Sequence, residues 1–327
     1  MNQSASNLSI LGIDVSKGKF DVALLREGKC KHKRFLNNLE GFKKLREWLA
    51  EYKVERLHAC MESTSTYGEA LAEYLHDRGF MVSIVNPARI KGFAQSELIR
   101  SKTDKVDASL IARFCAAMKP SLWTPESKEI RELRSLVRRV DALVEMRQQE
   151  INRLDVSDAV IKKTIENHID YLTKQIDSIK EQINKHIDRH PQLRDKQKLL
   201  QSIPGVGEAT IHLVLANFAN TEKFSNAKRL SAFLGIAPRE YQSGNSVRGR
   251  RRMSKVGRSS LRKAFFMPAL VALRYNPIIV EMKRRLTKAG KPKMLIVGAA
   301  MRKLIHIIYG VLKHGKPFDS NFALKNT

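Results

Sequence analysis

The stretch LSILGIDVSKGKFDVALL, residues 8–25, decides the fold of the first part of the chain. Two apolar runs, 8–14 and 20–25, have the residue types of β-strands, and the polar segment SKGK between them suits a hairpin turn. A third strand is expected around 33–36. A helix at about 40–51 and a strand at 56–62 follow.

The pattern then alternates between helices and strands. We expect an amphipathic helix near 67–78, a strand at 80–85, and helices after Pro87 and around 104–116. Three strands followed by helix, strand, helix, strand and helix predict an α/β domain with a mixed sheet. This domain is assigned to residues 1–125.

Between residues 126 and 190 the apolar side chains follow heptad spacing. One series is Leu133, Leu136, Val140 and Leu143, and a second is Ile165, Ile169, Leu172, Ile176, Ile179 and Ile183. Steps of three and four predict two long helices of the coiled-coil type. Pairing within one chain and pairing between two chains fit the sequence equally well.

The charge is high and unevenly distributed. The 327 residues hold 60 Lys and Arg against 33 Asp and Glu, a net charge of +27. Residues 1–110 carry 18 basic and 14 acidic side chains, whereas residues 191–327 carry 27 and 6. A polyanionic partner is therefore expected, bound mainly by a basic helical domain at 191–327.

Other features exclude classes of protein. Cys30, Cys60 and Cys115 lie far apart without a CxxC pair, so we interpret them as small buried side chains in a reducing cytoplasm. The N-terminus lacks the pattern of a signal peptide. The apolar stretches 294–301 and 304–312 are separated by Arg302 and Lys303 and are expected to be too short for a membrane span. We expect a cytoplasmic protein without membrane contact.

Four carboxylates in the first domain suggest a metal site. Asp14 and Glu62 each end a predicted strand, and Asp104 and Asp107 share one face of a predicted helix. Carboxylates gathered in one place repel each other unless cations neutralise them. Mg²⁺ suits such oxygen ligands, and two ions ~4 Å apart can assist the cleavage of a phosphodiester. Taken singly, each residue is better explained as a turn, a cap or a solvated helix face; the order of strand Asp, strand Glu and paired helix Asp is what makes the set specific.

A second interpretation of the opening hairpin is the phosphate loop of sugar kinases and actin-like ATPases. Those proteins need further glycine-rich turns to bind phosphate. The sequence has no DxG or GG pair placed to serve, so this interpretation ranks low.

The basic domain contains a segment of the helix-hairpin-helix type, SIPGVGEAT at 202–210. Gly205 and Gly207 permit a tight turn, and N–H groups at the start of the next helix can hold a DNA phosphate. An ordinary connection between two helices is the alternative.

A second basic segment follows at 239–263. It concentrates arginine and lysine around the sequence SGNS, with Ser243 and Ser246 as candidate nucleophiles. The residues expected to bind phosphate are Arg248, Arg250, Arg251, Arg252, Lys255 and Arg258. For a serine in a basic loop, simple phosphate binding is the commoner role.

Several blocks together resemble the DEDD transposases of insertion-sequence elements, the group of bridge-RNA-guided serine recombinases. The blocks, which lie within residues 8–318, are GIDVSK, CMESTSTYGEALAEYL, VNPARIKGFAQS, KTDKVDASLIARF, SIPGVGEAT, FLGIAPREYQSGNSVRGRRRMSKVG and MRKLIHIIYGVLKHGKPF. Asn245 departs from the pattern, since a relative has serine there; Ser246 remains as the nearby alternative to Ser243.

The resemblance implies a fold and a mechanism. It implies an RNase H-like (RuvC-like) domain in which Asp14, Glu62, Asp104 and Asp107 hold Mg²⁺, and a phosphoserine link between Ser243 and a cut DNA strand. It also implies donor and target DNA as partners, a structured guide RNA, and dimers that assemble to a tetramer.

We therefore expect a transposase that excises and inserts a mobile DNA element. The alternatives are a metal-dependent junction resolvase or nuclease in which Ser243 only binds phosphate, and a non-catalytic architectural protein that binds nucleic acid.

Overall fold

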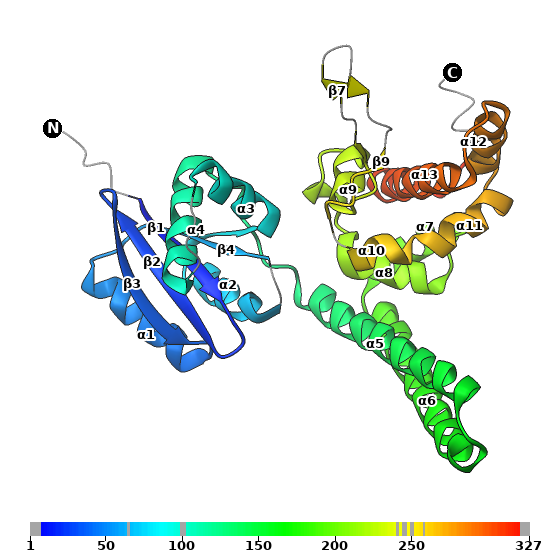
Figure 1. The fold of residues 1–327 in the computed structure, drawn as a ribbon, viewed down its shortest axis with the longest axis horizontal. Helices are drawn as coiled ribbons and strands as arrows, with labels where there is room; N and C mark the ends of the chain where they lie inside the picture. Colours follow the sequence, from blue (N-terminus) through cyan, green and yellow to red (C-terminus); the bar gives the residue numbers. More distant parts are fainter. Residues whose placement is uncertain are drawn as a thin grey trace. The chain divides into compact units, whose positions relative to one another are not determined.

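The computed structural model describes residues 8–63, 66–98, 103–239, 242–243, 247–248, 252–257 and 259–320. By its internal contacts the chain divides into two compact units, Met1–Glu126 and Ser127–Thr327 (Figure 1). Each unit has its own hydrophobic core.

The first unit is built on a mixed five-stranded sheet, as predicted. Its strands lie in the order β3-β2-β1-β4-β5. Strand β2 is antiparallel to both neighbours, and β1, β4 and β5 are mutually parallel. Their bounds are β1 Ser9–Val15, β2 Lys19–Arg26, β3 Lys29–Leu36, β4 Leu57–Glu62 and β5 Met81–Val85. This topology agrees with the expected RNase H-like fold.

Helices cover both faces of this sheet. Helices α1 (Leu39–Glu51) and α2 (Glu69–His76) cover one face, where Leu11 and Ile13 of β1 are buried. Helices α3 (Pro87–Ser96) and α4 (Asp104–Met118) cover the other face. Because side chains alternate along a strand, every second residue of β1 faces α4.

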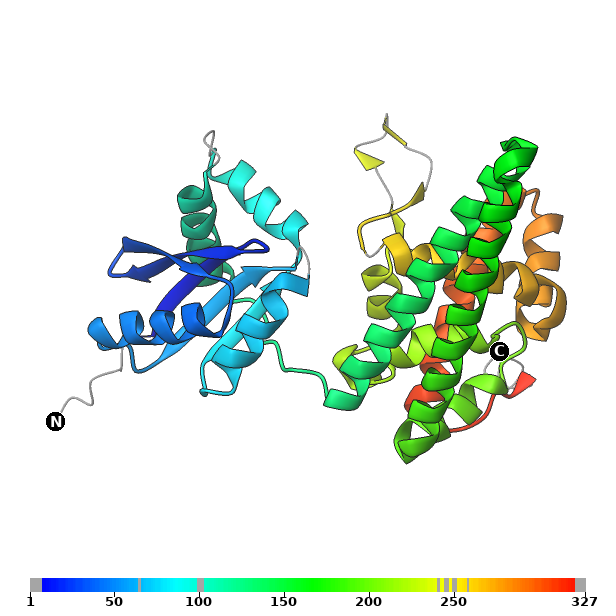
Figure 2. The same ribbon diagram turned by 90° about the horizontal axis from the view of Figure 1, so that it is seen from below.

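The second unit begins with a helical hairpin (Figure 2). Helices α5 (Lys128–Val156) and α6 (Ala159–Arg189) pack on each other within the chain. Leu143 contributes to the seam from α5, and Leu172 and Ile176 from α6. The structure thus shows the intramolecular pairing; pairing between chains stays a prediction.

Helices α5 and α6 share a core with the basic helices that follow. Leu133 and Ile183 belong to the same cluster as Leu215, Leu230 and the apolar side of the last helix. The bounds are α7 Pro191–Gln201, α8 Glu208–Phe218, α9 Ala227–Phe233, α10 Ser259–Ala264, α11 Phe266–Tyr275, α12 Pro277–Lys288 and α13 Lys293–His314. Residues before and after position 190, where the sequence analysis begins the basic domain, therefore share one hydrophobic core.

Helix α13 corrects one expectation. The two apolar stretches that are expected to be too short for a membrane span lie in one continuous helix of 22 residues, which is long and apolar enough to cross a membrane. Arg302 and Lys303 do not interrupt it because both are good helix formers. Ala300, Leu304 and Ile308 are completely buried. The helix packs as the core helix of this unit.

The sequence predicts that residues 191–327 are helical throughout, but the structure also contains short strands there. Short antiparallel ladders join β6 (Pro238–Arg239) to β9 (Arg252–Met253) and β7 (Gln242–Ser243) to β8 (Val247–Arg248). We call this segment the 238–253 hairpin. The sequence predicts a basic loop here, because strands of only two residues are too short to show a pattern of alternation.

Candidate functional site

Asp14 and Glu62 occupy neighbouring positions on adjacent parallel strands. Ile13 lies opposite Met61 in the β1–β4 ladder, so the next residue of each strand is Asp14 and Glu62. The residue two positions before each of them, Gly12 or Cys60, packs towards α4. Since side chains alternate, Asp14 and Glu62 project from the same α4-facing side of the sheet.

Gly12 allows α4 to approach this side of the sheet. A Cβ atom at Gly12 would lie 2.1 Å from the carbonyl oxygen of Ala108 and 2.4 Å from the nitrogen of Ala112. A side chain at position 12 is therefore incompatible with the observed position of α4.

The N-terminus of α4 carries the other two predicted carboxylates. Thr103 caps the helix, and its Oγ1 accepts a hydrogen bond of 3.3 Å from the nitrogen of Val106. Asp104 and Asp107 lie in the first turn, where the partial positive charge of a helix end stabilises carboxylates.

The two aspartates lie on different stripes of α4. Ala108, one turn after Asp104, packs with Ala23 of β2. Ile111, one turn after Asp107, packs with Cys60 of β4. Asp104 therefore lies towards the β2 side of the sheet, and Asp107 towards the side of β4, the strand that ends in Glu62.

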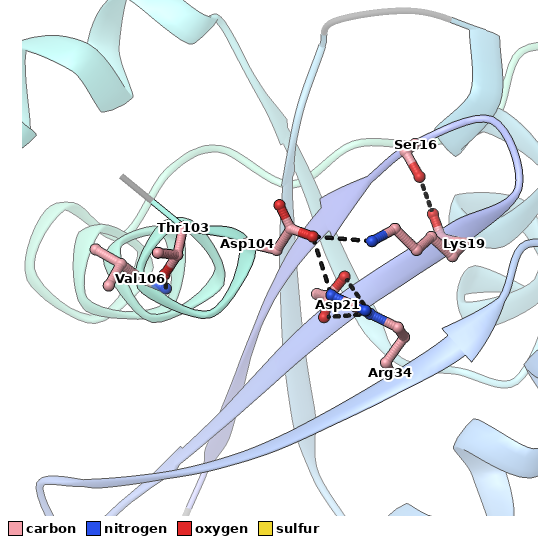
Figure 3. A network of polar contacts seen from close by, with 7 residues as sticks. All are labelled: Ser16, Lys19, Asp21, Arg34, Thr103, Asp104 and Val106. Atoms are coloured by element: carbon pink, nitrogen blue, oxygen red, sulfur yellow. Dashed lines mark hydrogen bonds and ion pairs between the residues drawn. The ribbon is translucent and has the colours of Figure 1, made fainter. Parts of the chain in front are cut away.

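Three charged residues that the sequence analysis missed complete this end of the sheet: Lys19, Asp21 and Arg34 (Figure 3). Lys19 Nζ lies 3.0 Å from Asp104 Oδ2. Arg34 donates from Nε to both Asp21 oxygens, at 3.0 and 3.1 Å, and from Nη2 to Asp104 Oδ2 at 3.0 Å. One guanidinium group thus bridges two carboxylates from β2 and α4.

We call the set Asp14, Asp21, Glu62, Asp104 and Asp107 the acidic face. Asp21 lies directly opposite Asp14 in the β1–β2 ladder, and only 9% of its side chain is exposed. The sequence held the signal for Asp21, because a hairpin centred on SKGK pairs residue 14 with residue 21. Arg34 follows from the β2–β3 register, in which it pairs with Asp21.

Lys19 and Arg34 lower the pKa of Asp104. The hydrogen bond and the charge of Lys19, helped by the charge of Arg34, hold the pKa of the Asp104 carboxyl below its usual range. Asp104 is therefore ionised at neutral pH.

The donor chemistry of the acidic face fits a hard divalent cation, because all five groups are carboxylates. In the described part of the chain, however, no three His, Cys, Asp or Glu side chains lie close enough together to hold a metal ion. The acidic face therefore places suitable metal ligands at one end of the sheet, but no three of its described side chains are already close enough together to coordinate one ion.

Comparison with known proteins agrees with this fold. Residues 11–157 match the transposase family model named for the DEDD transposases of IS110, and residues 197–284 match the model described as transposase IS116/IS110/IS902 family. The pilin gene-inverting protein of Moraxella bovis is 34% identical over 312 residues, 94% of this chain and 97% of that protein. The transposase for insertion sequence element IS1328 of Yersinia enterocolitica is 24% identical over 81% of this chain and 84% of that protein.

The chain belongs to the IS110 family of transposases. It is an enzyme that acts on DNA.

In the IS110-family transposase the residues SIPGVG, 202–207, connect α7 to α8, and EAT begins α8. Gly205 has φ +96°, and a Cβ there would lie 2.8 Å from Ala272 of α11. Gly207 is extended, with no atom within 4 Å of a Cβ. Packing thus accounts for Gly205, while phosphate binding by either glycine stays a prediction.

The start of α8 already has a carboxylate beside it. Glu208, in the first turn, accepts a hydrogen bond of 2.9 Å from Asn184 Nδ2. A phosphate bound at this helix end would meet a negative charge, which weakens the case for a phosphate site here.

The predicted basic residues of the transposase are described in part. Arg250, Arg251 and Arg258 lie outside the described residues, as do the side chains of Ser243 and Arg248. Arg252 of β9 is exposed and pairs across the ladder with Arg239 of β6.

The 238–253 hairpin is anchored at its base by close backbone contact. Lys255 N donates to the carbonyl of Gly235 at 3.1 Å. A Cβ on Gly257, at φ +148°, would lie 2.5 Å from the nitrogen of Gly235. Arg262 Nη1 donates to the carbonyl of Lys255 at 3.2 Å. These contacts fix where the strands of the hairpin start.

Two cysteines that are far apart in sequence meet in the first unit. Cys60 of β4 and Cys115 of α4 are both buried, and the hydrogen bond to Cys115, together with burial, raises the pKa of the Cys60 thiol. Cys30 is partly exposed, so the expectation of three buried cysteines was wrong for this one. It lies on the edge strand β3, where a neighbouring strand covers only one side.

Proposed function

We propose that this protein cuts and rejoins DNA at the ends of a mobile element, and that the acidic face performs the cleavage with divalent metal. The observation that carries the proposal is the convergence of β1, β2, β4 and the N-terminus of α4 around five carboxylates. The family and the names of its relatives, a transposase and a gene-inverting protein, support the reaction class.

Asp14, Glu62, Asp104 and Asp107 are the residues that would hold Mg²⁺, with Asp21 beside them. Bound Mg²⁺ would neutralise charge on the scissile phosphate and on its leaving oxygen. Close backbone packing positions the ligand set, because the absence of a side chain at Gly12 lets α4 bring Asp104 and Asp107 over the sheet. We propose that two ions bind at each site.

The 238–253 hairpin would hold the nucleic acid backbone. Arg239 and Arg252 are exposed and face each other across its ladder. Like charges in directly opposite positions destabilise a sheet, and a bound phosphate would remove the repulsion. Lys255 extends this basic surface beyond β9.

The covalent role of Ser243 is a second candidate. It is favoured by the position of Ser243 in β7, paired with Val247, one ladder position from the pair of Gln242 with Arg248. In this version Ser243 attacks the phosphodiester, a DNA 3′ or 5′ oxygen leaves, and the phosphoserine bond is later exchanged for a DNA hydroxyl. In the other version water attacks at the acidic face, and Ser243 only binds phosphate.

The guide RNA and the assembly of dimers into a tetramer complete the proposal. Both come from the resemblance to the family. We also infer that the protein works in the cytoplasm, associated with the nucleoid while it acts.

One experiment tests the proposal. Purified protein is incubated with DNA carrying the element's ends, the element's RNA and Mg²⁺, and cleaved DNA and protein–DNA adducts are measured. Asp14→Asn is expected to abolish cleavage, whereas Asp77→Asn, at an exposed carboxylate after α2, is expected to leave it unchanged. Cleavage by Asp14→Asn at the normal rate would refute the role of the acidic face.

The same reactions separate the two versions. An adduct that disappears in Ser243→Ala supports covalent serine chemistry. Free cleaved ends without any adduct, and normal cleavage by Ser243→Ala, support hydrolysis at the acidic face.

A further inference from the structure

The acidic face contains its own cations. Lys19 Nζ and Arg34 Nη2 both lie 3.0 Å from Oδ2 of Asp104. Carboxylates gathered at one end of a sheet repel each other, and positive charge must offset this repulsion. In this structure, a lysine and an arginine supply positive charge at the place where a divalent cation would be expected.

The two ion pairs with Asp104 can separate with little loss of stability. The side chains of Lys19 and Asp104 are 41% and 48% exposed, and that of Arg34 is 54% exposed. Exposed ion pairs contribute little to stability, so little is lost when they separate. Long side chains can then reorient without movement of the strands.

Asp21 is different, because its side chain is only 9% exposed and both of its oxygens accept from Arg34 Nε. A buried carboxylate is costly without a partner. Arg34 can therefore keep Asp21 through Nε while Nη2 leaves Asp104 and becomes free to donate elsewhere.

The sequence fixes where Lys19 lies. Ser16 closes the β1–β2 turn, with its nitrogen and its Oγ both donating to the carbonyl oxygen of Lys19, at 2.9 and 2.7 Å. The turn connects the end of β1, where Asp14 lies, to Lys19, the first residue of β2. Lys19 is thus held beside the acidic face, with only its side chain free to move.

We propose that Lys19 and Arg34 exchange partners during the reaction. Without metal they neutralise Asp104; when a divalent cation binds the carboxylates, they turn to the phosphodiester of the bound DNA. The proposal rests on the proposed function of the acidic face. The ligand is the phosphodiester group, which a guanidinium and an ammonium both bind through N–H donors.

A first consequence is competition between these side chains and the metal. Removing one cation removes a competitor, so the metal should bind more tightly, although the activity should fall. A residue with a merely structural role would not move these two quantities in opposite directions.

The test measures Mn²⁺ binding to the full-length protein by calorimetry in the absence of nucleic acid, and DNA cleavage separately. Lys19→Met is the principal variant. Lys17→Met, an exposed lysine of the same turn, is the matched control. We expect Lys19→Met to bind Mn²⁺ about 3- to 10-fold more tightly and to cleave more slowly, and Lys17→Met to match the wild type.

Arg34 gives a second arm. Arg34→Met leaves Asp21 without its partner, so its folding is checked by thermal unfolding and Arg34→Lys is compared with it. Arg34→Lys keeps the charge and is expected to retain wild-type Mn²⁺ affinity, while Arg34→Met binds more tightly. Lys31→Met, an exposed lysine of the same strand, is the control.

The outcomes distinguish this inference from the function on which it rests. Unchanged or weaker Mn²⁺ binding by Lys19→Met, with Asp14→Asn still abolishing binding, overturns the exchange and leaves the metal site standing. Wild-type protein that binds no Mn²⁺ overturns both. Tighter binding by Lys19→Met with normal cleavage rules out the phosphate contact, and so also contradicts the exchange.

Discussion

Gly12 of β1 lies directly beneath Ala108 of α4, and the helix backbone fills the space that a side chain at position 12 would need. Asp104 and Asp107 begin this helix, so its distance from the sheet sets where they lie. Gly12→Ala is expected to lower the free energy of unfolding of the first unit by about 3 kcal/mol or more, as overpacking does. Urea unfolding measures it.

Gly92→Ala is the matched control for that variant. Gly92 is in α3, and a Cβ there would meet no atom within 4 Å. Alanine should stabilise the helix by about 0.5–1 kcal/mol. Equal unfolding energies for the two variants would contradict the packing argument for Gly12.

The two glycines of the α7–α8 turn should behave differently. Gly205→Ala forces a side chain into a left-handed conformation against Ala272, and should destabilise the second unit by about 2–4 kcal/mol. Gly207→Ala meets no neighbour and should change stability little. Thermal unfolding compares them. A loss of DNA affinity in folded Gly207→Ala would show that the turn also binds phosphate.

The second unit should lose stability in mild acid. His212 is buried, and burial lowers its pKa; burial and then Arg302 lower the pKa of His306. The unfolded chain therefore takes up these protons at a higher pH than the folded protein does. The stabilisation is complete above the ordinary histidine pKa of about 6.5 and is lost as the pH falls through the lowered folded value.

The corresponding measurement is urea unfolding between pH 7.5 and 5. The slope is expected to reach at most about 1.4 kcal/mol per pH unit for each histidine. His212→Gln should flatten it, and His314→Gln, at the exposed end of α13, should not. An unchanged pH profile in His212→Gln would exclude this histidine as the cause.

The arginine pair of the 238–253 hairpin predicts a salt effect. If Arg252 binds a phosphate, Arg252→Gln should weaken DNA binding at every sequence and reduce the slope of log affinity against log salt by about 1. Filter binding at several salt concentrations measures this. The slope should be unchanged in Lys17→Gln, which lies in the other unit.

Much of the fold could be predicted from local patterns. The strands at 8–14 and 20–25, the helices at 40–51 and 104–116, and the two long helices between 126 and 190 all lie close to the predicted bounds. The strands of the 238–253 hairpin and the uninterrupted apolar length of α13 could not be predicted, because very short strands have no period and two charged residues do not by themselves interrupt a helix.

The acidic face was predicted incompletely. Asp14, Glu62, Asp104 and Asp107 were selected because each stands at the end of an element or on one helix face. Asp21 was overlooked although the hairpin register places it opposite Asp14. Lys19 and Arg34 looked like two of many basic residues, since nothing in their spacing marks them as partners of a residue on a distant helix.

The sequence by itself determined the order of strands and helices, the family, the basic character of the second unit and four of the five carboxylates of the acidic face. These properties follow from local periodicity, charge and motif order along the chain. Only the tertiary structure decided that α4 rests on Gly12 and that Lys19 and Arg34 meet Asp104. Such contacts join residues 70 to 100 positions apart, and they depend on which strand a helix crosses, which no local pattern encodes.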